Sequence, residues 1–481
     1  MDKHPADARL RTGQDYLRGI ERRRALYYGD QRVESVSRHP ELSLQAGHIA
    51  QVYDVLAAPE HRQLVMAKDG GGSVPIAYKR PTSGADLAQL RGCVELALAR
   101  TSPMLERLPL LAPSCLLALA LCEARVDKES RCKGNALAFL QRQAGEQSYI
   151  VPATVDPRGN RALRADQQHD PDLSLRVVRE SDAGIHVRGA KMVATAAAIA
   201  DELIVLPTSG GVKEEIDYAL SFAVPIDSDG ITVIARRGYR HAERGDQQFS
   251  QFDESDAMVA FDDVFVPWER VFVYKEPEMV RAMRTHITAW SSIHFLIGAK
   301  AKAELMLGLA SLISSHNGIR DTPGIQAKLM EIATYIETVG AFLTAAEARP
   351  VVAFADTVSP APSLLAAGRY YAANNYHPLL KTVHDVAGSL ASTGLSIGDV
   401  KDAAIRELVG KYYATDRIDG LTRLKVFRLI HDLTVGELAG HKALFMIFAE
   451  GSLMAHVSRL AGVFDLKPYE QQAARIVGDI E

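Results

Sequence analysis

Cysteine is scarce and neither sign of charge dominates in this chain of 481 residues. The four cysteines, Cys93, Cys115, Cys122 and Cys132, stand at no disulfide or metal-ligand spacing, which favours reduced thiols in a cytoplasmic protein and no metal centre. The formal net charge is −4 and the basic residues are scattered, so nothing in the composition indicates nucleic-acid binding.

Long hydrophobic runs are missing as well. A membrane span needs roughly 20 consecutive apolar residues, and the stretch that comes closest, residues 110–124, is shorter and ends in charge. We therefore expect a buried helix at 110–124 and no membrane partner. The polar N-terminus lacks the apolar core of a signal peptide, which again favours the cytoplasm.

What the chain does contain is a change of pattern along its length. Residues 1–145 show mostly helical spacing, residues 146–275 carry short strand-like runs between turn residues, and residues 276–481 return to long helical stretches. A chain this long, with 47% hydrophobic residues, has enough apolar side chains for more than one core. We expect a mostly helical α+β fold, with an N-terminal helical domain, an antiparallel β-domain of six to eight strands and a C-terminal four-helix bundle.

Periodicity also predicts the individual elements. The predicted helices are 7–28, 46–56, 85–99, 279–315, 324–348, 363–391 and 422–460. The predicted strands are 32–36, 202–206, 219–225, 231–235 and 257–261, with a β-hairpin over 175–189.

Residues 147–208 combine two features that suit a cofactor site. Around a turn at 182–184, alternating side chains predict the hairpin just named. The loop before it, 155–161, is rich in turn residues and charges that no core strand would carry. A rigid hairpin beside a polar loop is a platform for a bound cofactor, although an ordinary surface hairpin would explain this stretch taken alone.

Two sets of residues carry a family resemblance. The N-terminal set is Arg11-Thr12-Gly13, Tyr16-Leu17, Tyr28-Gly29-Asp30, His39-Pro40 and Tyr53-Asp54. The longer set is QFDESDA at 251–257, followed by FDDVFVPWERVF at 261–272. With the order of the three parts, these motifs resemble the 4-hydroxyphenylacetate 3-monooxygenase family, whose fold is acyl-CoA dehydrogenase-like with a middle antiparallel β-barrel. The loop at 156–161 and residues 450–455 resemble more closely a sister branch, the 4-hydroxybutyryl-CoA dehydratases.

The resemblance implies FAD bound between the β-domain and the bundle, in a homotetramer of paired dimers. In that family a separate flavin reductase delivers reduced FAD, and O2 adds to it to give a C4a-hydroperoxide that hydroxylates a phenol. Carried over to this chain, the cofactor contacts are Ser148, Tyr149, Ile150, Thr154, Asp156, Arg158, Thr195, Glu450, Gly451, Ser452 and Leu453. Hydroxyls and backbone N–H groups can bond the flavin ring edges, and Arg158 suits the pyrophosphate.

The family polarises its phenol with an arginine, a tyrosine and a histidine. The arginine position is Arg107, but the other two positions are occupied here by Leu111 and Ser148. Because leucine cannot hydrogen-bond a phenol, this pattern favours a larger or less polar substrate. Tyr149 and His286 are the candidate catalytic replacements, and the assigned substrate contacts are Arg107, Leu111, Ser148, Thr208 and Ser209. A purely structural role, in which Arg107 only forms an ion pair with Glu106 or Glu95, is an equally good interpretation of this residue.

Other chemistries are weighed against hydroxylation. The dehydratases need a four-iron cluster on three cysteines and a histidine, and no cysteine follows Cys132, so this chemistry is nearly excluded. His286, Trp290 and His294 share one helix face, as pocket lining or as packing. The leading hypothesis is a two-component, FADH2-dependent monooxygenase that hydroxylates an aromatic or related substrate of specialised metabolism. The alternatives are a non-oxygenating flavoenzyme acting on an acyl thioester and a degenerate flavin-binding protein.

Overall fold

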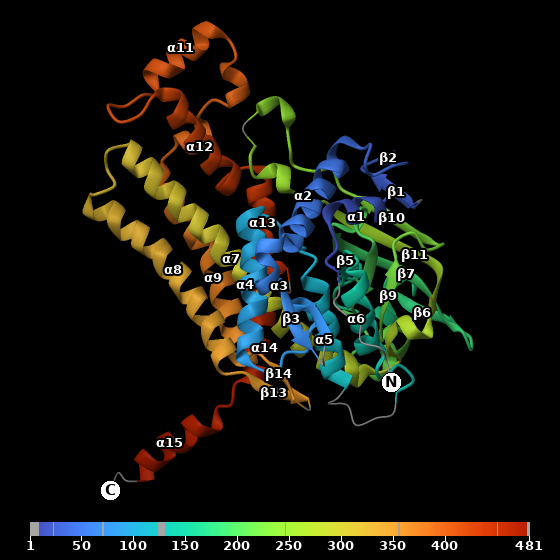
Figure 1. The fold of residues 1–481 in the computed structure, drawn as a ribbon. Helices are drawn as coiled ribbons and strands as arrows, with labels where there is room; N and C mark the ends of the chain where they lie inside the picture. Colours follow the sequence, from blue (N-terminus) through green and yellow to red (C-terminus); the bar gives the residue numbers. More distant parts are fainter. Residues whose placement is uncertain are drawn as a thin grey trace.

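The computed structural model describes residues 9–22, 24–69, 72–123, 130–245, 247–354, 356–449 and 451–478. Helices come first along the chain, two sheets follow, and long helices come last. Figure 1 shows the long helices α7, α8 and α9 on one side of the molecule and the strands on the other, with α4 and α5 between them. This helix–sheet–helix order is the one expected of an acyl-CoA dehydrogenase-like fold.

Two sheets pack around one core on the side of the molecule away from the long helices (Figure 1). The six-stranded sheet has the order β2 (Gln31–Arg32), β1 (Ala25–Tyr28), β10 (Ile231–Ala235), β11 (Asp256–Pro267), β7 (Gly184–Thr195) and β6 (Arg176–Glu180). The four-stranded sheet has the order β12 (Val271–Tyr274), β9 (Leu220–Pro225), β8 (Glu202–Val205) and β5 (Ile150–Ala153). Phe222 of β9 and Phe261 of β11 meet between the sheets, with ring centroids 6.2 Å apart. The predicted hairpin is β6 and β7.

The predicted closed antiparallel barrel is wrong. A barrel closes only when its two edge strands pair, and within the described ranges the large sheet ends at β2 and β6 and the small one at β12 and β5. The sheets are also mixed, because β1 lies parallel to β10 and β5 lies parallel to β8. The helix predicted for 7–28 is wrong in part: α1 covers Gly13–Gly19, whereas Ala25–Tyr28 form β1.

The N-terminal helices divide between two hydrophobic cores. Side chains of α1 and of α2 (Pro40–Ala57) join the core of the sheets. Those of α4 (Gly84–Arg100), α5 (Leu111–Glu123) and α6 (Asn135–Glu146) join the core of the bundle. The buried helix expected at 110–124 is α5, which packs against α7. The loop 101–110 between α4 and α5 therefore runs where the two cores meet.

The bundle is built on α7 (Pro277–His316), α8 (Pro323–Ala348) and α9 (Pro362–Ala387), which pack against one another. The single helix predicted for 422–460 is wrong, because this stretch forms α12 (Gly420–Thr434), α13 (Glu437–Phe448) and α14 (Leu453–Val463). The second break lies at Gly451, whose φ of +119° is a left-handed conformation that favours glycine. Ser452 then caps α14 by accepting a hydrogen bond from the Ala455 N–H.

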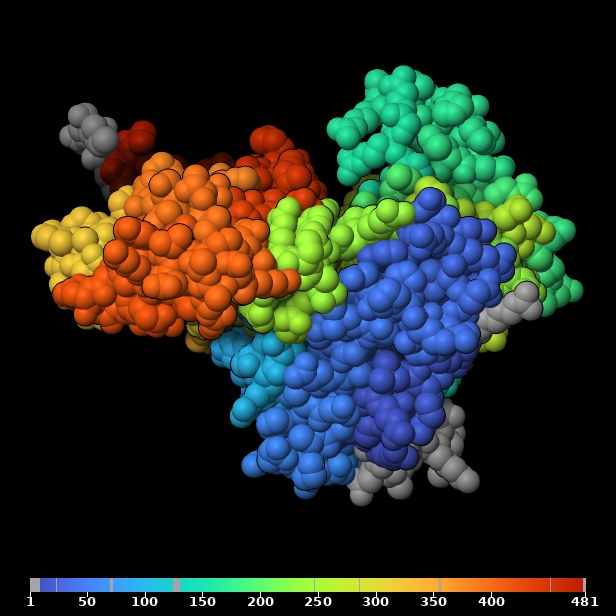
Figure 2. Space-filling view, turned by 90° about the horizontal axis from the view of Figure 1, so that it is seen from above, coloured from blue at the N-terminus to red at the C-terminus, as the bar shows by residue number. Residues whose placement is uncertain are grey.

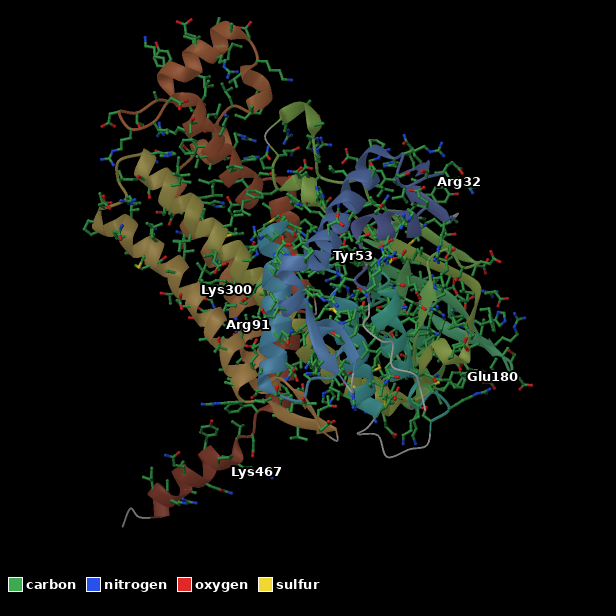
Figure 3. The ribbon with its side chains drawn as sticks, viewed as in Figure 1. Arg32, Tyr53, Arg91, Glu180, Lys300 and Lys467 are labelled. Atoms are coloured by element: carbon green, nitrogen blue, oxygen red, sulfur yellow. The ribbon has the colours of Figure 1, made fainter. Side chains whose placement is uncertain are left out.

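The shorter elements lie at the periphery. They are α3 (Arg62–Val65), β3 (Met66–Asp69), β4 (Gly72–Pro75), β13 (Val351–Phe354), β14 (Thr357–Ser359), α10 (Leu390–Thr393), α11 (Ala403–Tyr412) and α15 (Lys467–Gly478). Helix α15, which begins at Lys467, extends away from the body of the molecule (Figures 1 and 3) and buries no described residue.

By length and composition alone, two helical stretches, Pro323–Ala348 and Gly420–Val463, could cross a membrane. The first is α8, which packs against α7 and α9. The second is the interrupted run from α12 to α14. Helices that pack inside a bundle need such apolar side chains.

Candidate active site

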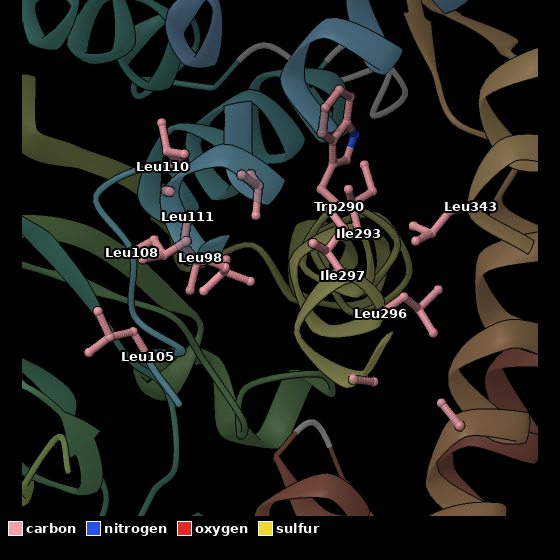
Figure 4. Packing of buried hydrophobic residues seen from close by; sticks show 14 of the residues in the cluster. Leu98, Leu105, Leu108, Leu110, Leu111, Trp290, Ile293, Leu296, Ile297 and Leu343 are labelled. Carbon is pink, nitrogen blue, oxygen red and sulfur yellow. The ribbon is translucent and has the colours of Figure 1, made fainter. Parts of the chain in front are cut away.

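A cavity of about 320 Å³ lies where the α4–α5 loop, the end of β5, α7 and the α13–α14 turn meet. Its wall is mainly apolar, with side chains from α4, the α4–α5 loop, α5, α7 and α13. The apolar lining includes Val94, Leu98, Leu105, Leu108, Leu111, Met283, Ile287 and Met446. Figure 4 shows leucines of the α4–α5 region near helix α7, whose labelled residues belong to the bundle core and not to the cavity lining. Figure 2 shows a notch between the loop that follows β5 and the C-terminal helices. A largely apolar cavity with a few polar groups is typical of a small-molecule site.

Arg107 lines this cavity from the α4–α5 loop. Its guanidinium carbon lies 5.3 Å from the ring centroid of Phe445 on α13, within cation–π range. Its Nε is buried and has no hydrogen-bond partner among the described residues. The two carboxylates expected as ion-pair partners of Arg107 pair with other residues. Glu95 lies 3.2 Å from Arg91, and Glu106 lies 3.0 Å from Lys302.

His294 is the histidine of α7 that lines the cavity. Its Nε2 lies 3.0 Å from the Ser114 hydroxyl on α5, and its buried Nδ1 has no hydrogen-bond partner in the described part of the chain. Burial, and next the positive charge of Arg107, lowers the pKa of His294 to about 4. The imidazole is therefore neutral near pH 7, with one nitrogen oriented by Ser114 and the other without a partner.

The sequence analysis proposed His286 instead, two turns earlier on α7. Eight residues of helix span about 12 Å, and of the histidines in the described part of α7 it is His294, not His286, that lines the cavity. His286 is buried. Trp290, between them, is fully buried in the bundle core (Figure 4). The shared face was identified correctly, but the cavity opens further along the helix.

The structure brings six predicted site residues to the cavity. They are Arg107, Leu111, Thr154, Arg158, Thr208 and Gly451. They come from the α4–α5 loop, the start of α5, the end of β5 with the loop after it, the segment after β8 and the α13–α14 turn. The predicted position between the β-domain and the bundle is thus where the cavity lies.

Tyr149 lies behind the cavity wall and not in it. Its ring is fully buried, and its hydroxyl donates a hydrogen bond of 2.6 Å to the carbonyl oxygen of Arg107. Burial raises the pKa of Tyr149 well above its usual value, so the hydroxyl keeps its proton. Tyr149 therefore holds the Arg107 backbone from behind the wall.

Asp156 is tied into a buried network beneath the loop. Its carboxylate lies 2.6 Å from Nζ of Lys191 and accepts a hydrogen bond of 2.5 Å from the Thr208 hydroxyl. Lys191 also donates to the carbonyl oxygens of Thr154 and Leu206. This network fixes two segments of the cavity rim to β7.

The other predicted contacts lie outside the cavity lining. Thr195 is buried and donates to Asp256 at 2.7 Å, and Ser452 caps α14. Ser148 and Ile150 flank Tyr149, Ser209 follows Thr208, and Leu453 begins α14. Glu450 lies outside the described residues.

Sequence reasoning missed Lys302 and undervalued His294. His294, Gly298 and Lys302 recur every four residues on α7, and all three line the cavity. A buried lysine inside a long helix is unusual, because lysine is almost never fully buried without a partner. The four-residue spacing of His294, Gly298 and Lys302 was the signal in the sequence that could have identified Lys302 as a cavity residue.

The cavity rim suits FAD. The hydroxyls of Thr154 and Thr208 and the backbone at Gly451 offer groups for the edges of the flavin ring, and Arg158 and Arg459 offer cations for the pyrophosphate. Arg107 and His294 line the same cavity, and each has a buried nitrogen without a partner in the described part of the chain. The residues present thus fit a flavin at the rim and a polar substrate group inside.

Comparison with known proteins identifies relatives along nearly the whole chain. The family model described as 4-hydroxyphenylacetate 3-hydroxylase N terminal matches residues 12–273, and the C-terminal model of the same family matches residues 281–478. The oxygenase component of 4-hydroxyphenylacetate 3-monooxygenase from Thermus thermophilus is 26% identical to this chain over 473 residues. The alignment covers 96% of each of the two proteins.

Two further relatives show the range of similar proteins. A monooxygenase of Streptomyces globisporus, named for a chlorinated hydroxyphenyl β-amino acyl group on a peptidyl-carrier protein, is 28% identical and aligns over 92% of this chain and 85% of its own. A crystal structure of a 4-hydroxyphenylacetate 3-monooxygenase oxygenase component with FAD and 4-hydroxyphenylacetate has a TM-score of 0.89, 25% identity and 98% coverage of both chains.

Proposed function

The chain belongs to the 4-hydroxyphenylacetate 3-hydroxylase family, and on that premise we propose that it is the oxygenase component of a two-component system that hydroxylates a phenol. It is a flavin-dependent monooxygenase with FAD as its cofactor, as membership of this family implies. One observation carries the proposal for the substrate. Arg107 and His294 line one largely apolar cavity, and each has a buried nitrogen, Nε of Arg107 and Nδ1 of His294, without a hydrogen-bond partner among the described residues.

These two groups suit a phenol that becomes a phenolate. Arg107 donates to the phenolate oxygen and stabilises its charge, which a low-dielectric cavity strengthens. His294, oriented by Ser114, accepts the phenol proton at Nδ1. Burial and Arg107 lower the pKa of His294, whereas a phenolate bound beside the imidazole would offset Arg107 and favour the protonated ring.

The walls of the cavity exclude water from the reacting atoms. Leu98, Leu105, Leu108 and Leu111 surround the polar groups with side chains that cannot hydrogen-bond. When bound, reduced FAD would supply the activated oxygen, and we propose the hydroperoxide route for it. A dry site protects such chemistry from loss as hydrogen peroxide.

The substrate that we propose is larger or less polar than 4-hydroxyphenylacetate. Leu111 stands in the cavity where the family has a tyrosine, and Ser148 is the residue at the family's histidine position. Such a site loses two polar contacts to a small hydroxyphenyl acid. The Streptomyces relative, named for a phenol on a carrier protein, supports a role in specialised metabolism.

The proposed working form is a cytoplasmic homotetramer served by a separate flavin reductase. Helix α15 buries no described residue and exposes Tyr469, Ile476 and Val477. A second copy of the chain would remove this apolar surface from water. Light scattering on the purified protein measures the assembly, and a monomer at micromolar concentration would contradict it.

A single-turnover experiment tests the hydroxylation. The protein is loaded with chemically reduced FAD and a panel of phenols without oxygen, then mixed with oxygen-18 gas, and products are measured by mass spectrometry. We expect one labelled oxygen in a catechol-type product and little hydrogen peroxide. Complete conversion of O2 to hydrogen peroxide with every phenol would contradict the proposal. Binding of acyl thioesters with a change in the flavin spectrum would instead favour the non-oxygenating alternative, and no spectral change with any ligand would favour a degenerate flavin-binding protein.

A further inference from the structure

Four buried charged side chains meet beside Arg107. Glu106 lies 3.0 Å from Nζ of Lys302 on α7 and 3.2 Å from Nζ of Lys442 on α13. Lys442 also lies 3.8 Å from Glu254, which precedes β11. All four side chains are nearly inaccessible to water, with at most 6% of any of them exposed. The α4–α5 loop, the β-domain and the bundle each contribute to this cluster.

Glu254 binds the backbone on which Arg107 sits. One carboxylate oxygen accepts the N–H of Glu106 at 2.7 Å, and the other accepts the N–H of Arg107 at 2.8 Å. These residues form no helix or strand, so their buried N–H groups need acceptors from elsewhere in the fold. On the other side of the residue, Tyr149 donates to the Arg107 carbonyl oxygen. The peptide groups flanking the Arg107 Cα are thus bonded to the β-domain through both Glu254 and Tyr149.

The charges of the cluster balance, and each depends on the others. Burial, and next the neighbouring Glu106, raises the pKa of Glu254, while Lys442 opposes that rise. Burial alone would lower the pKa of Lys442, but Glu106 and Glu254 outweigh it and the pKa is raised, so the ammonium stays charged. Burial lowers the pKa of Lys302. Two carboxyl groups thus face two amino groups, and loss of one partner leaves a buried charge uncompensated.

We propose that Glu254 and Tyr149 are positioning residues that clamp Arg107 against the substrate, with Lys442 holding the charge of Glu254. Neither Glu254 nor Tyr149 lines the cavity formed by the described residues, so their effect on substrate passes through Arg107. The inference rests on the proposed function, because it assumes that Arg107 stabilises a bound phenolate. It adds Glu254 to the site and gives Tyr149 a role that passes through the Arg107 backbone.

The experiment uses 4-nitrophenol as a coloured probe of the full-length protein saturated with FAD. Its absorbance reports how much of the bound probe is phenolate, without any turnover. We expect Arg107→Gln to weaken phenolate binding about 100-fold and Glu254→Gln or Tyr149→Phe about tenfold. The matched control is Glu243→Gln, because Glu243 is an exposed carboxylate of the same region and should leave the affinity unchanged.

A double-mutant cycle separates positioning from general loss of structure. If Glu254 acts through Arg107, Glu254→Gln should change the affinity for phenolate less than twofold in the Arg107→Gln background. Tyr149→Phe should also change that affinity less than twofold in the same background. Full additivity overturns the inference, as does unchanged binding in both single variants. Should Glu254→Gln unfold, the Tyr149→Phe cycle decides alone. If Arg107→Gln itself leaves phenolate binding unchanged, the proposed function fails at that residue, which is a different result.

Discussion

Replacing Lys191 with methionine tests whether a buried ion pair holds the cavity rim. Nζ of Lys191 lies 2.6 Å from the Asp156 carboxylate, with the two side chains only 2% and 9% exposed. Methionine would leave that carboxylate buried, with the Thr208 hydroxyl still donating to it. Removing one member of a buried pair costs about 3–5 kcal/mol. We expect a loss of that size in the free energy of unfolding.

The assay is equilibrium urea unfolding, run beside a titration with FAD. Lys191→Met also removes the bonds to the Thr154 and Leu206 carbonyl oxygens, so FAD should bind at least about tenfold more weakly, because small misplacements of binding groups are costly. Arg188→Met on the same strand is the control. The pair of Arg188 with Asp262 is 42% and 84% exposed, and such pairs contribute about 1 kcal/mol or less.

A second substitution makes the test sharper. Asp156→Asn added to Lys191→Met removes the unpaired charge, so most of the lost stability should return. The reasoning is refuted if Lys191→Met is no more destabilising than Arg188→Met. It is equally refuted if Asp156→Asn restores nothing in the Lys191→Met background.

Three further predictions concern the cavity and the C-terminal helix. His294→Gln should lower single turnover about 100-fold with FAD affinity within about twofold. The pKa of His294 is about 4 in the folded protein, below the value of about 6.5 in the unfolded chain. The wild type should therefore lose up to about 3 kcal/mol of stability as the pH falls from the higher value to the lower. Urea titrations of His294→Gln should show a smaller loss over the same pH range. Leu111→Tyr should tighten 4-hydroxyphenylacetate binding about tenfold by supplying a donor, and unchanged calorimetric affinity would contradict this. Removing residues 466–481 should reduce the assembly size measured by light scattering, while an unchanged mass would show that α15 is not part of the contact.

The long, strongly periodic helices could be predicted from the sequence to within a few residues. Residues 279–315 and 324–348 correspond to α7 and α8, because an apolar face repeated over many turns leaves few alternatives. The stretch 422–460 misled the analysis, since its periodicity continues through Gly436 and Gly451 while the backbone turns there. Strand β1 was missed because its partner, β10, lies about 200 residues away, and such pairing leaves no local pattern.

The sequence predicted several residues of the site but not how they are arranged in space. The motifs led to Arg107, Thr154 and Arg158, and the structure brings these residues to one cavity. Periodicity placed His286 and His294 on one face of α7 but could not say which turn of the helix meets the cavity. The partners of Lys191 come from two segments about 50 residues apart, so no sequence spacing could reveal its burial.

The α4–α5 loop explains why the stretch around residue 254 belongs to the site although it does not line the cavity. A buried segment without helix or strand must bond its peptide groups to other segments, and residues 106 and 107 do so through Glu254. The carboxylate in turn needs Lys442, which α13 supplies. Arg107 therefore reaches the cavity only when the β-domain and the bundle are both in place. The motif QFDESDA thus has a physical role in setting the position of Arg107.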